Sequence, residues 1–212
     1  MSILSVGPNA TSESLAKHNN LTGYSRGTVN LYFQLLNRAT ERNSELIDSI
    51  IQDSGGKVTM PMETVYLENY LSGYKFEYIA FNNVQCGIPR KEGLYRIDRR
   101  TIRIFYNTNK CSVKRQRYSK IHELWHICQL FDLEFRDAID YLMEKTNFPP
   151  ELIGELIEKS ADKATAIYLM PNDYFISKYN ETQNIRELSD YFQVSVPSIM
   201  YRMKECGLIT RY

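Results

Sequence analysis

Hydrophobic residues recur at helical spacing in the first quarter of the chain, and this pattern predicts a long helix between Thr28 and Asp53. The apolar positions that carry the pattern are Leu31, Leu35, Leu46, Ile50 and Ile51. The helix is expected to stop at Gly55-Gly56, since paired glycines favour a turn. Residues 1–27 are polar and rich in Ser, Asn and Gly, which predicts a loose N-terminal tail.

Between residues 57 and 107 the pattern changes to short apolar runs that predict strands and turns. The runs are TVYLENYL, YKFEYIAF and GLYRIDRRTIRIFYN. In the last run Ile102, Ile104 and Tyr106 occupy alternate positions, as in a strand with one buried face. Helices are expected over residues 119–130, 135–145 and 150–169, followed by two short helical patterns between residues 185 and 209. The predicted fold class is therefore α+β, with a small sheet packed on helices.

The composition is that of a globular protein, with 43% hydrophobic and 24% charged residues among 212. This length suits one compact domain, or one domain with a small appendage. The start lacks a cationic region followed by an apolar run, so no signal peptide is expected, and no apolar stretch is long enough to span a membrane. The four cysteines form no CxxC pair, so we interpret them as reduced thiols of a cytoplasmic protein.

Charge is distributed unevenly along the chain, although the net charge is only +1. Residues 90–120 carry 11 Lys and Arg against two acids, whereas residues 121–181 carry five basic and 12 acidic residues. The simpler interpretation is two solvated faces that partly neutralise each other. The alternative is a basic rim that steers an acidic partner or a nucleic acid towards a functional site.

The segment SKIHELWHICQL contains the motif His122-Glu123-Leu124-Trp125-His126. Two histidines four positions apart lie about 40° apart around a helix axis, so both imidazoles can reach one metal ion. Glu123 lies on the adjoining arc, where its carboxylate can face a water on that metal. A metal lowers the pKa of such a water from about 15.7 towards roughly 7, and the carboxylate takes its proton as the water attacks a carbonyl. The motif therefore predicts a zinc-dependent hydrolase with two histidine ligands and Glu123 as general base.

A catalytic zinc site usually has a third protein ligand, and a carboxylate is favoured here because the remaining histidine, His18, lies in the tail. The helix over residues 150–169 offers four acids: Glu151, Glu155, Glu158 and Asp162. Helical geometry leaves the choice open, because all four lie along one stripe. The alternative to a metal site is a surface helix with incidental histidines, or a core histidine pair. Two of the three histidines in one motif favour the metal site.

Three segments resemble the ImmA/IrrE family of bacterial metallopeptidases. RQRYSKIHELWH (115–126) is similar to the family's Arg-x-Arg-Phe-Thr approach to the HExxH helix, and ELIEKSADKATAIYLMP (155–171) is similar to its segment that ends in Leu-Met-Pro. LSDYFQVSVPSIMYRMKECGL (188–208) resembles the winged-helix-like tail common in that family. The resemblance covers about the C-terminal half, and the N-terminal third has none.

The resemblance implies that Glu158 is the third zinc ligand, beside His122 and His126, and that Glu123 is the base. Asp162 follows Glu158 by four positions, as in thermolysin-like zincins, where the Asp accepts a hydrogen bond from a ligand imidazole and fixes its orientation.

Two positions depart from the family pattern. Trp125 stands where the family usually has Gly, so its ring is expected in an apolar slot or as a cleft wall that narrows substrate access. Tyr118 replaces the usual Phe, which is a mild change. The small residues Ser160, Ala161 and Ala164 are expected to let the acidic helix approach the HExxH helix closely.

The resemblance also implies a domain plan and a substrate. A zincin-like metallopeptidase core is expected over residues 28–176, with a small sheet packed on the HExxH helix, and a winged-helix-like or helix-turn-helix-like tail over residues 182–212. Family members cleave helix-turn-helix repressors, which implies a protein substrate cut at few sites and zinc as cofactor. The tail carries four basic and three acidic residues, and this lack of a cationic excess argues against nucleic-acid binding.

Two other functions remain open at this point. One is a zinc-containing regulator that binds a repressor or DNA without cleavage, which the basic residues 90–120 support. The other is the toxin component of a toxin–antitoxin pair, which would use the same chemistry on another target. The intact Glu123 favours the peptidase, since a structural zinc has no need of a base.

Overall fold

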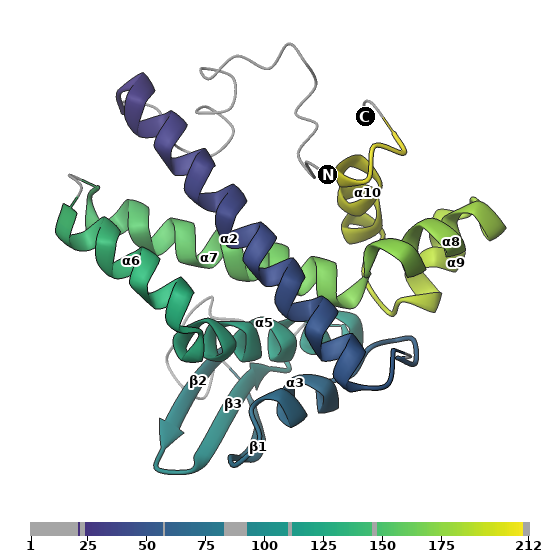
Figure 1. Cartoon of the computed structure of the whole chain (residues 1–212). Helices are drawn as coiled ribbons and strands as arrows, with labels where there is room; N and C mark the ends of the chain where they lie inside the picture. Colours follow the sequence, from purple (N-terminus) through teal and green to yellow (C-terminus); the bar gives the residue numbers. More distant parts are fainter. Residues whose placement is uncertain are drawn as a thin grey trace.

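The protein folds, in a computed structural model, as a set of helices stacked on one side of a small sheet (Figure 1). The structure describes residues 21, 24–56, 58–82, 93–109, 112–145 and 148–209. The described helices are α2 (Arg26–Asp53), α3 (Val65–Tyr70), α5 (Val113–Phe131), α6 (Leu133–Lys145), α7 (Pro150–Leu169), α8 (Asn172–Thr182), α9 (Ile185–Tyr191) and α10 (Val196–Glu205). The strands are β1 (Lys75–Phe81), β2 (Gly93–Asp98) and β3 (Thr101–Asn107). The predicted α+β class is confirmed.

The sheet has the strand order β1-β3-β2. The central strand β3 runs parallel to β1 and antiparallel to β2. Its predicted alternation is confirmed at Ile102 and Ile104, which are fully buried in the main core, whereas Tyr106 is only partly buried. Strand β2 pairs with β3 alone, so no described strand covers its other edge. That edge lies beside α5.

Helix α5 lies between the sheet and the other long helices (Figure 1). One face of α5 is buried through Ile121, Leu124 and Trp125, which belong to the same apolar core as the buried side chains of β3. Helix α7 packs closely on α5, as predicted from its small residues: Ser160, Ala161 and Ala164 are fully buried, and Gln129 of α5 donates a hydrogen bond to Ser160. A second core joins the N-terminal half of α2 to α6 and the start of α7. These contacts hold α5 and α7 side by side.

Two sequence predictions about elements are corrected by the structure. The segment TVYLENYL lies in the stretch predicted to form strands and turns, but Val65–Tyr70 forms the short helix α3. The buried side chains Leu67 and Leu71 are four positions apart, as on one face of a helix, whereas Val65, which a strand would place on the same face as Leu67, is exposed. Helix α5 begins at Val113, earlier than residue 119, because the Ser112 side chain accepts a hydrogen bond from the Arg115 amide and caps a polar first turn.

The last helices are attached to the rest of the protein by cationic side chains. Arg202 of α10 is 1% exposed and donates hydrogen bonds to the Met170 carbonyl and to Asn172. Arg117 of α5 donates to the Phe192 carbonyl, and Lys114 pairs with Asp190. Helices α8 to α10 therefore pack on the ends of α5 and α7.

The predicted limits of the tail and the two domains, at residues 1–27, 28–176 and 182–212, remain predictions. Residues 1–20, 22 and 23 lie outside the described residues. Helix α2 already begins at Arg26, with Ser25 as its N-cap, and Leu21 is 1% exposed against the second core. Among the described helices, none has the length and apolar character that crossing a membrane requires.

Candidate metal centre

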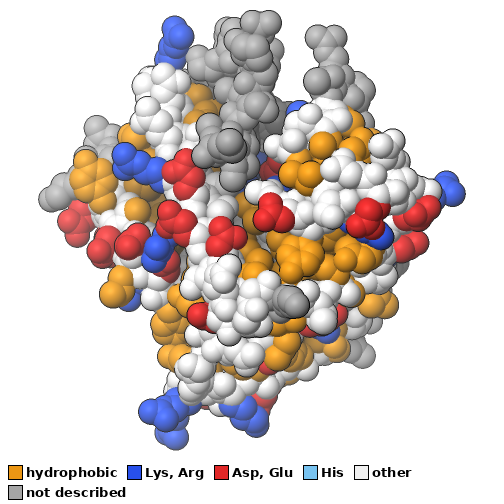
Figure 2. Space-filling view, turned by 45° about the vertical axis from the view of Figure 1, so that its right-hand side comes forward, with side chains coloured by type: hydrophobic (Ala, Val, Ile, Leu, Met, Phe, Trp, Pro, Cys, Tyr) orange, Lys and Arg blue, Asp and Glu red, His pale blue; other side chains and the backbone are white. Residues whose placement is uncertain are grey.

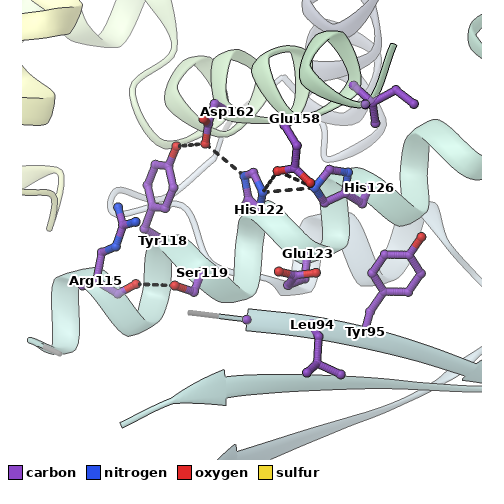
Figure 3. Close-up of a pocket in the computed structure, with 13 residues that line it drawn as sticks. Leu94, Tyr95, Arg115, Tyr118, Ser119, His122, Glu123, His126, Glu158 and Asp162 are labelled. Carbon is purple, nitrogen blue, oxygen red and sulfur yellow. Dashed lines mark hydrogen bonds and ion pairs between the residues drawn. The ribbon is translucent and has the colours of Figure 1, made fainter. Parts of the chain in front are cut away.

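Helices α5 and α7 bring three side chains of the predicted site to one point (Figure 3). The Nε2 atoms of His122 and His126 lie 3.0 Å apart. The Glu158 Oε2 atom lies 3.3 Å from the first of these nitrogens and 3.5 Å from the second. Within the described part of the chain, these residues form the group of His, Cys, Asp and Glu side chains placed to hold a metal ion.

The spacing of the three ligand atoms fits a zinc ion. Ligands about 2.0–2.2 Å from a tetrahedral ion stand roughly 3.3–3.6 Å from one another. The distances of 3.0, 3.3 and 3.5 Å between the two nitrogens and the carboxylate oxygen fall near this range. Two imidazoles and one carboxylate are also a donor set that zinc takes in hydrolytic sites, with the fourth position left to water.

Asp162 lies behind His122, one helical turn after Glu158. Its Oδ1 atom lies 3.2 Å from His122 Nδ1, although the angle between them is poor for a hydrogen bond. The same Oδ1 atom accepts a 2.8 Å hydrogen bond from the Tyr118 hydroxyl. The Tyr118 ring also stacks on the imidazole, with an interplanar angle of 20°. The Tyr118 hydroxyl, which a Phe at this position would lack, therefore holds the carboxylate that lies beside His122.

These contacts shift the pKa values of the metal-free site. Burial alone would lower the pKa of His122, but its interactions with Asp162 and Glu158 outweigh burial and raise that pKa to about 9. Hydrogen bonds from His122 and His126 hold the pKa of the Glu158 carboxyl well below its ordinary value. Burial favours a raised pKa for Asp162, yet His122 and Tyr118 lower it overall. Both acids are thus anionic near neutral pH and suited to a cation.

Glu123 lies on the other side of the histidines, between α5 and strand β2 (Figure 3). Its side chain is largely buried, with the whole residue 9% exposed. It shares with the three ligands a cavity of about 740 Å³. Besides the site residues, the cavity is lined by Gly93, Leu94, Tyr95, Arg115, Tyr118, Ser119, Gly154 and Ile157. A carboxylate therefore stands beside the metal position inside a cleft that can receive a ligand.

The structure also decides which acids of α7 face the histidines. Glu158 and Asp162 do, whereas Glu151 and Glu155 are absent from the cavity lining. The charge of Glu155 instead contributes, after burial, to raising the pKa of Tyr32 in the second core to about 12. Because α7 is rotated in this way, one turn of the helix places Glu158 beside the two histidine nitrogens and the next places Asp162 beside His122 Nδ1.

Trp125 plays no part in the cleft. Its ring is fully buried in the main core, packs edge-on to Tyr168 at 6.0 Å between centroids, and is absent from the cavity lining. The expected apolar slot is therefore found, and the expectation of a wall that narrows substrate access is wrong. Trp125 follows Glu123 by two positions, so its side chain lies about 160° around the helix axis from the Glu123 side chain and enters the core.

Sequence reasoning missed Gly93 and Tyr95 of strand β2. Tyr95 stacks on His126, with ring centroids 6.4 Å apart, and lines the cavity. Burial raises the pKa of the Tyr95 hydroxyl, and the nearby charges of Glu123 and Glu158 add to that shift. No local pattern marks these positions, because they reach the HExxH helix only through the packing of β2 on α5.

The HExxH histidines of α5 and Glu158 of α7 converge on one point in a cleft, an arrangement that is typical of metal centres in hydrolases. The sequence profile of the Peptidase_M78 family, described as an IrrE N-terminal-like domain, matches residues 89–204. The match covers more than half of the chain and includes β2, the two helices of the site and most of α10. The chain therefore belongs to this family of metallopeptidases. A search of curated proteins finds no match to the chain.

Proposed function

We propose that the protein is a zinc-dependent endopeptidase in which His122, His126 and Glu158 hold the ion and Glu123 is the general base. The observation that carries the proposal is the convergence of three ligand atoms within 3.5 Å of one another beside a largely buried carboxylate. A structural zinc site is usually closed by four protein ligands and needs no such carboxylate. This set of three, open to a cleft, suits hydrolysis.

The residues divide the work of peptide hydrolysis between them. A zinc ion in this site would polarise the scissile carbonyl and make a water molecule more acidic. Glu123 accepts the proton of the attacking water and then delivers it to the amine that leaves. Asp162 holds the His122 ring by its Nδ1 side, so that Nε2 faces the ligand position. The burial of Glu123 keeps its carboxylate at one place, which favours proton transfer over a short distance.

The proposed substrate is a protein, namely a transcriptional repressor of the helix-turn-helix type or another regulatory protein, cut at few sites. Support comes from the family resemblance and from the cleft, which Gly93, Leu94 and Tyr95 of β2 line and where no described strand pairs with the second edge of β2. An extended peptide can add to such an edge through backbone hydrogen bonds.

We also propose that the protein is cytoplasmic, since Cys128 and Cys206 are free thiols.

We further propose that α5, α7 and the sheet form a zincin-like core and that α9 and α10 form a helix-turn-helix-like tail. The short turn between α9 and α10 supports this, with its Ser195 N-cap on the second helix. Residues 182–209 contain these helices and no described strand, so the wing of a winged helix has no counterpart in this part of the chain. The proposed role of the tail is to dock a partner protein.

The competing function is a regulator that binds a repressor or DNA without cutting it. The exposed arginines of the β2–β3 hairpin, Arg96, Arg99 and Arg100, favour it. Other cations of the basic stretch are engaged internally: Arg103 pairs with Glu77, and the Arg117 guanidinium is directed at backbone carbonyls of Met62 and Phe192. A toxin would share the peptidase chemistry and differ only in its target.

The test is to incubate the zinc-loaded protein with the repressor encoded beside its own gene and to measure intact masses. The proposal predicts two fragments whose masses add up to the repressor plus one water. A chelator should abolish the cleavage, and added zinc should restore it. If the repressor is bound but stays whole, the regulator is the better account. If another protein is cut instead, the peptidase assignment stands and the substrate assignment fails.

A further inference from the structure

Gly93, the first residue of β2, lies directly against the side chain of Glu123. A Cβ atom added to Gly93 would lie 2.7 Å from Glu123 Oε1, 2.9 Å from Cγ and 3.2 Å from Cδ. Contacts below 3.0 Å are essentially never seen for a real Cβ atom. Because Cγ itself is among the atoms that clash, a larger residue would displace most of the Glu123 side chain and not only its tip.

Space, and not backbone conformation, is what requires glycine at this position. The glycines with positive φ in the described part of the chain are Gly55, Gly56, Gly73 and Gly207, so Gly93 has a backbone that other residues adopt freely. It pairs with Tyr106 of β3 in the regular antiparallel ladder. Glycine weakens a strand because it has more backbone freedom to lose on folding. Its presence in β2 is therefore a cost that another feature must offset.

Neither element can easily move to make room for a side chain. The neighbour of Glu123 on α5, Leu124, is fully buried in the main core, so the helix is fixed against the sheet. Strand β2 is held along its length by β3, from Gly93 to Asp98. Glu123 would have to change rotamer, and a new rotamer carries its carboxylate away from the point where His122 and His126 meet Glu158.

We propose that Gly93 is a positioning residue, whose missing side chain keeps open the space that holds the Glu123 carboxylate beside the metal centre. The catalytic consequence rests on the proposed function, in which Glu123 is the base. The steric claim depends only on the contact between Gly93 and Glu123, so it applies equally to the metal-free protein.

The first experiment compares thermal unfolding midpoints of the metal-free protein for four chains: wild type, Gly93→Ala, Glu123→Ala and the double variant. Gly→Ala at a compatible position normally stabilises, since it restricts the unfolded chain. The proposal predicts that Gly93→Ala raises the midpoint in the Glu123→Ala background but raises it less, or lowers it, when Glu123 is present. The expected difference is at least about 2 °C for a protein of this size.

A matched control is Gly154→Ala on α7, where nothing lies within 4 Å of the added Cβ. It should raise the midpoint equally with and without Glu123, because alanine favours a helix over glycine. Equal effects of Gly93→Ala in the two backgrounds would overturn the proposal. If Gly93→Ala alone fails to fold, rescue by Glu123→Ala supports the proposal, and failure in both backgrounds overturns it.

The second experiment measures zinc content and steady-state cleavage for Gly93→Ala. If the substitution displaces the base, we expect full zinc content, an unchanged KM and a kcat about 10- to 100-fold lower than that of the wild type. An unchanged kcat would contradict the positioning role, because the carboxylate would then tolerate the Cβ atom. If the wild type cleaves no substrate, the proposed function fails, and the thermal comparison still decides whether Gly93 makes room for Glu123.

Discussion

At the scale of single residues, helix α5 directs some side chains into the cleft and others into the apolar core. His122, Glu123 and His126 face the cleft, whereas Trp125 sits among them in the sequence and is fully buried in the core. The family usually has glycine at this place, so the large ring must be accommodated by the core of this chain. The Trp125 ring meets Tyr168 of α7 there.

The Trp125 ring should therefore contribute to stability more than to catalysis. We expect Trp125→Ala to lower the free energy of unfolding by about 3–5 kcal/mol, because it leaves a large cavity in a packed core. Urea denaturation measures this change, with Tyr201→Ala as the control because Tyr201 is 64% exposed. A loss no larger than that of the control would mean that the core closes around the gap or that the ring packs elsewhere.

The pKa of His122 predicts how the metal-free protein responds to pH. Its value of about 9 in the folded protein lies above the value of about 6.5 expected for an unfolded chain. The stabilisation is therefore fully present below pH 6.5 and is lost as the pH rises through about 9. Urea denaturation in the presence of a chelator should show stability falling across this range. The fall should be smaller in His122→Gln, and an identical profile in both chains would refute the pairing with Asp162 and Glu158.

At the scale of elements, the metal centre depends on how closely α7 approaches α5. The Gln129 side chain of α5 donates a 2.6 Å hydrogen bond to Ser160 of α7, and Ala161 is fully buried one turn after Glu158. Small side chains at this contact let a short carboxylate reach two imidazoles on the neighbouring helix.

Ala161→Leu tests this dependence without changing a ligand. The larger side chain should push α7 from its place and weaken zinc binding, in addition to a strain of about 1–3 kcal/mol in the folded protein. Competition with a coloured chelator measures the zinc affinity. Ala138→Leu on α6 is a suitable control, because Ala138 is exposed. Equal zinc affinities in the two variants would show that the helix spacing does not limit the site.

The sequence predicted those elements that have strong local signals and missed those that depend on packing. The bounds of α7 followed from Pro150 and the residues after Leu169, and α5 was recognised by its HExxH motif. The residues of α3 favour a strand by composition, and the helix becomes evident only in the structure, where Leu67 and Leu71 are buried one turn apart.

The site residues likewise divide into those that local sequence patterns predict and those that depend on packing. Two histidines four apart on a helix share a face by local geometry alone. The choice of Glu158 over Glu151 and Glu155 depends on the rotation of α7 against α5, which helical spacing leaves open and the family resemblance indicated. The β2–β3 hairpin and the first half of α5 separate Gly93 from Glu123 along the chain, so their contact appears only in three dimensions.

At the scale of the whole molecule, the charged side chains are spread over separate regions. Figure 2 shows Lys and Arg gathered at the lower end of one face and Asp and Glu across its middle. Some of the Lys and Arg residues of the sequence are buried or paired inside the protein. Arg202 and Arg117, for example, donate hydrogen bonds that hold the last helices in place. On this face the cationic side chains do not form the continuous surface that duplex DNA requires.

We therefore expect no binding of duplex DNA at physiological salt. Fluorescence anisotropy with a labelled duplex, measured over a series of salt concentrations, tests this expectation. Tight binding that weakens steeply with salt would instead support the regulator, and Arg96, Arg99 and Arg100 would be the first residues to substitute by Gln.

The most direct test of the central claim is the cleavage rate of Glu123→Gln, measured with its zinc content. The amide keeps nearly the shape of the carboxylate but cannot accept a proton, so binding and chemistry should separate. Zinc content should equal that of the wild type, while kcat falls by about 10²- to 10⁴-fold. Glu155→Gln is the matched control and should keep full activity, since Glu155 is absent from the cavity lining. Cleavage by Glu123→Gln at the wild-type rate would contradict the assignment of Glu123 as the general base.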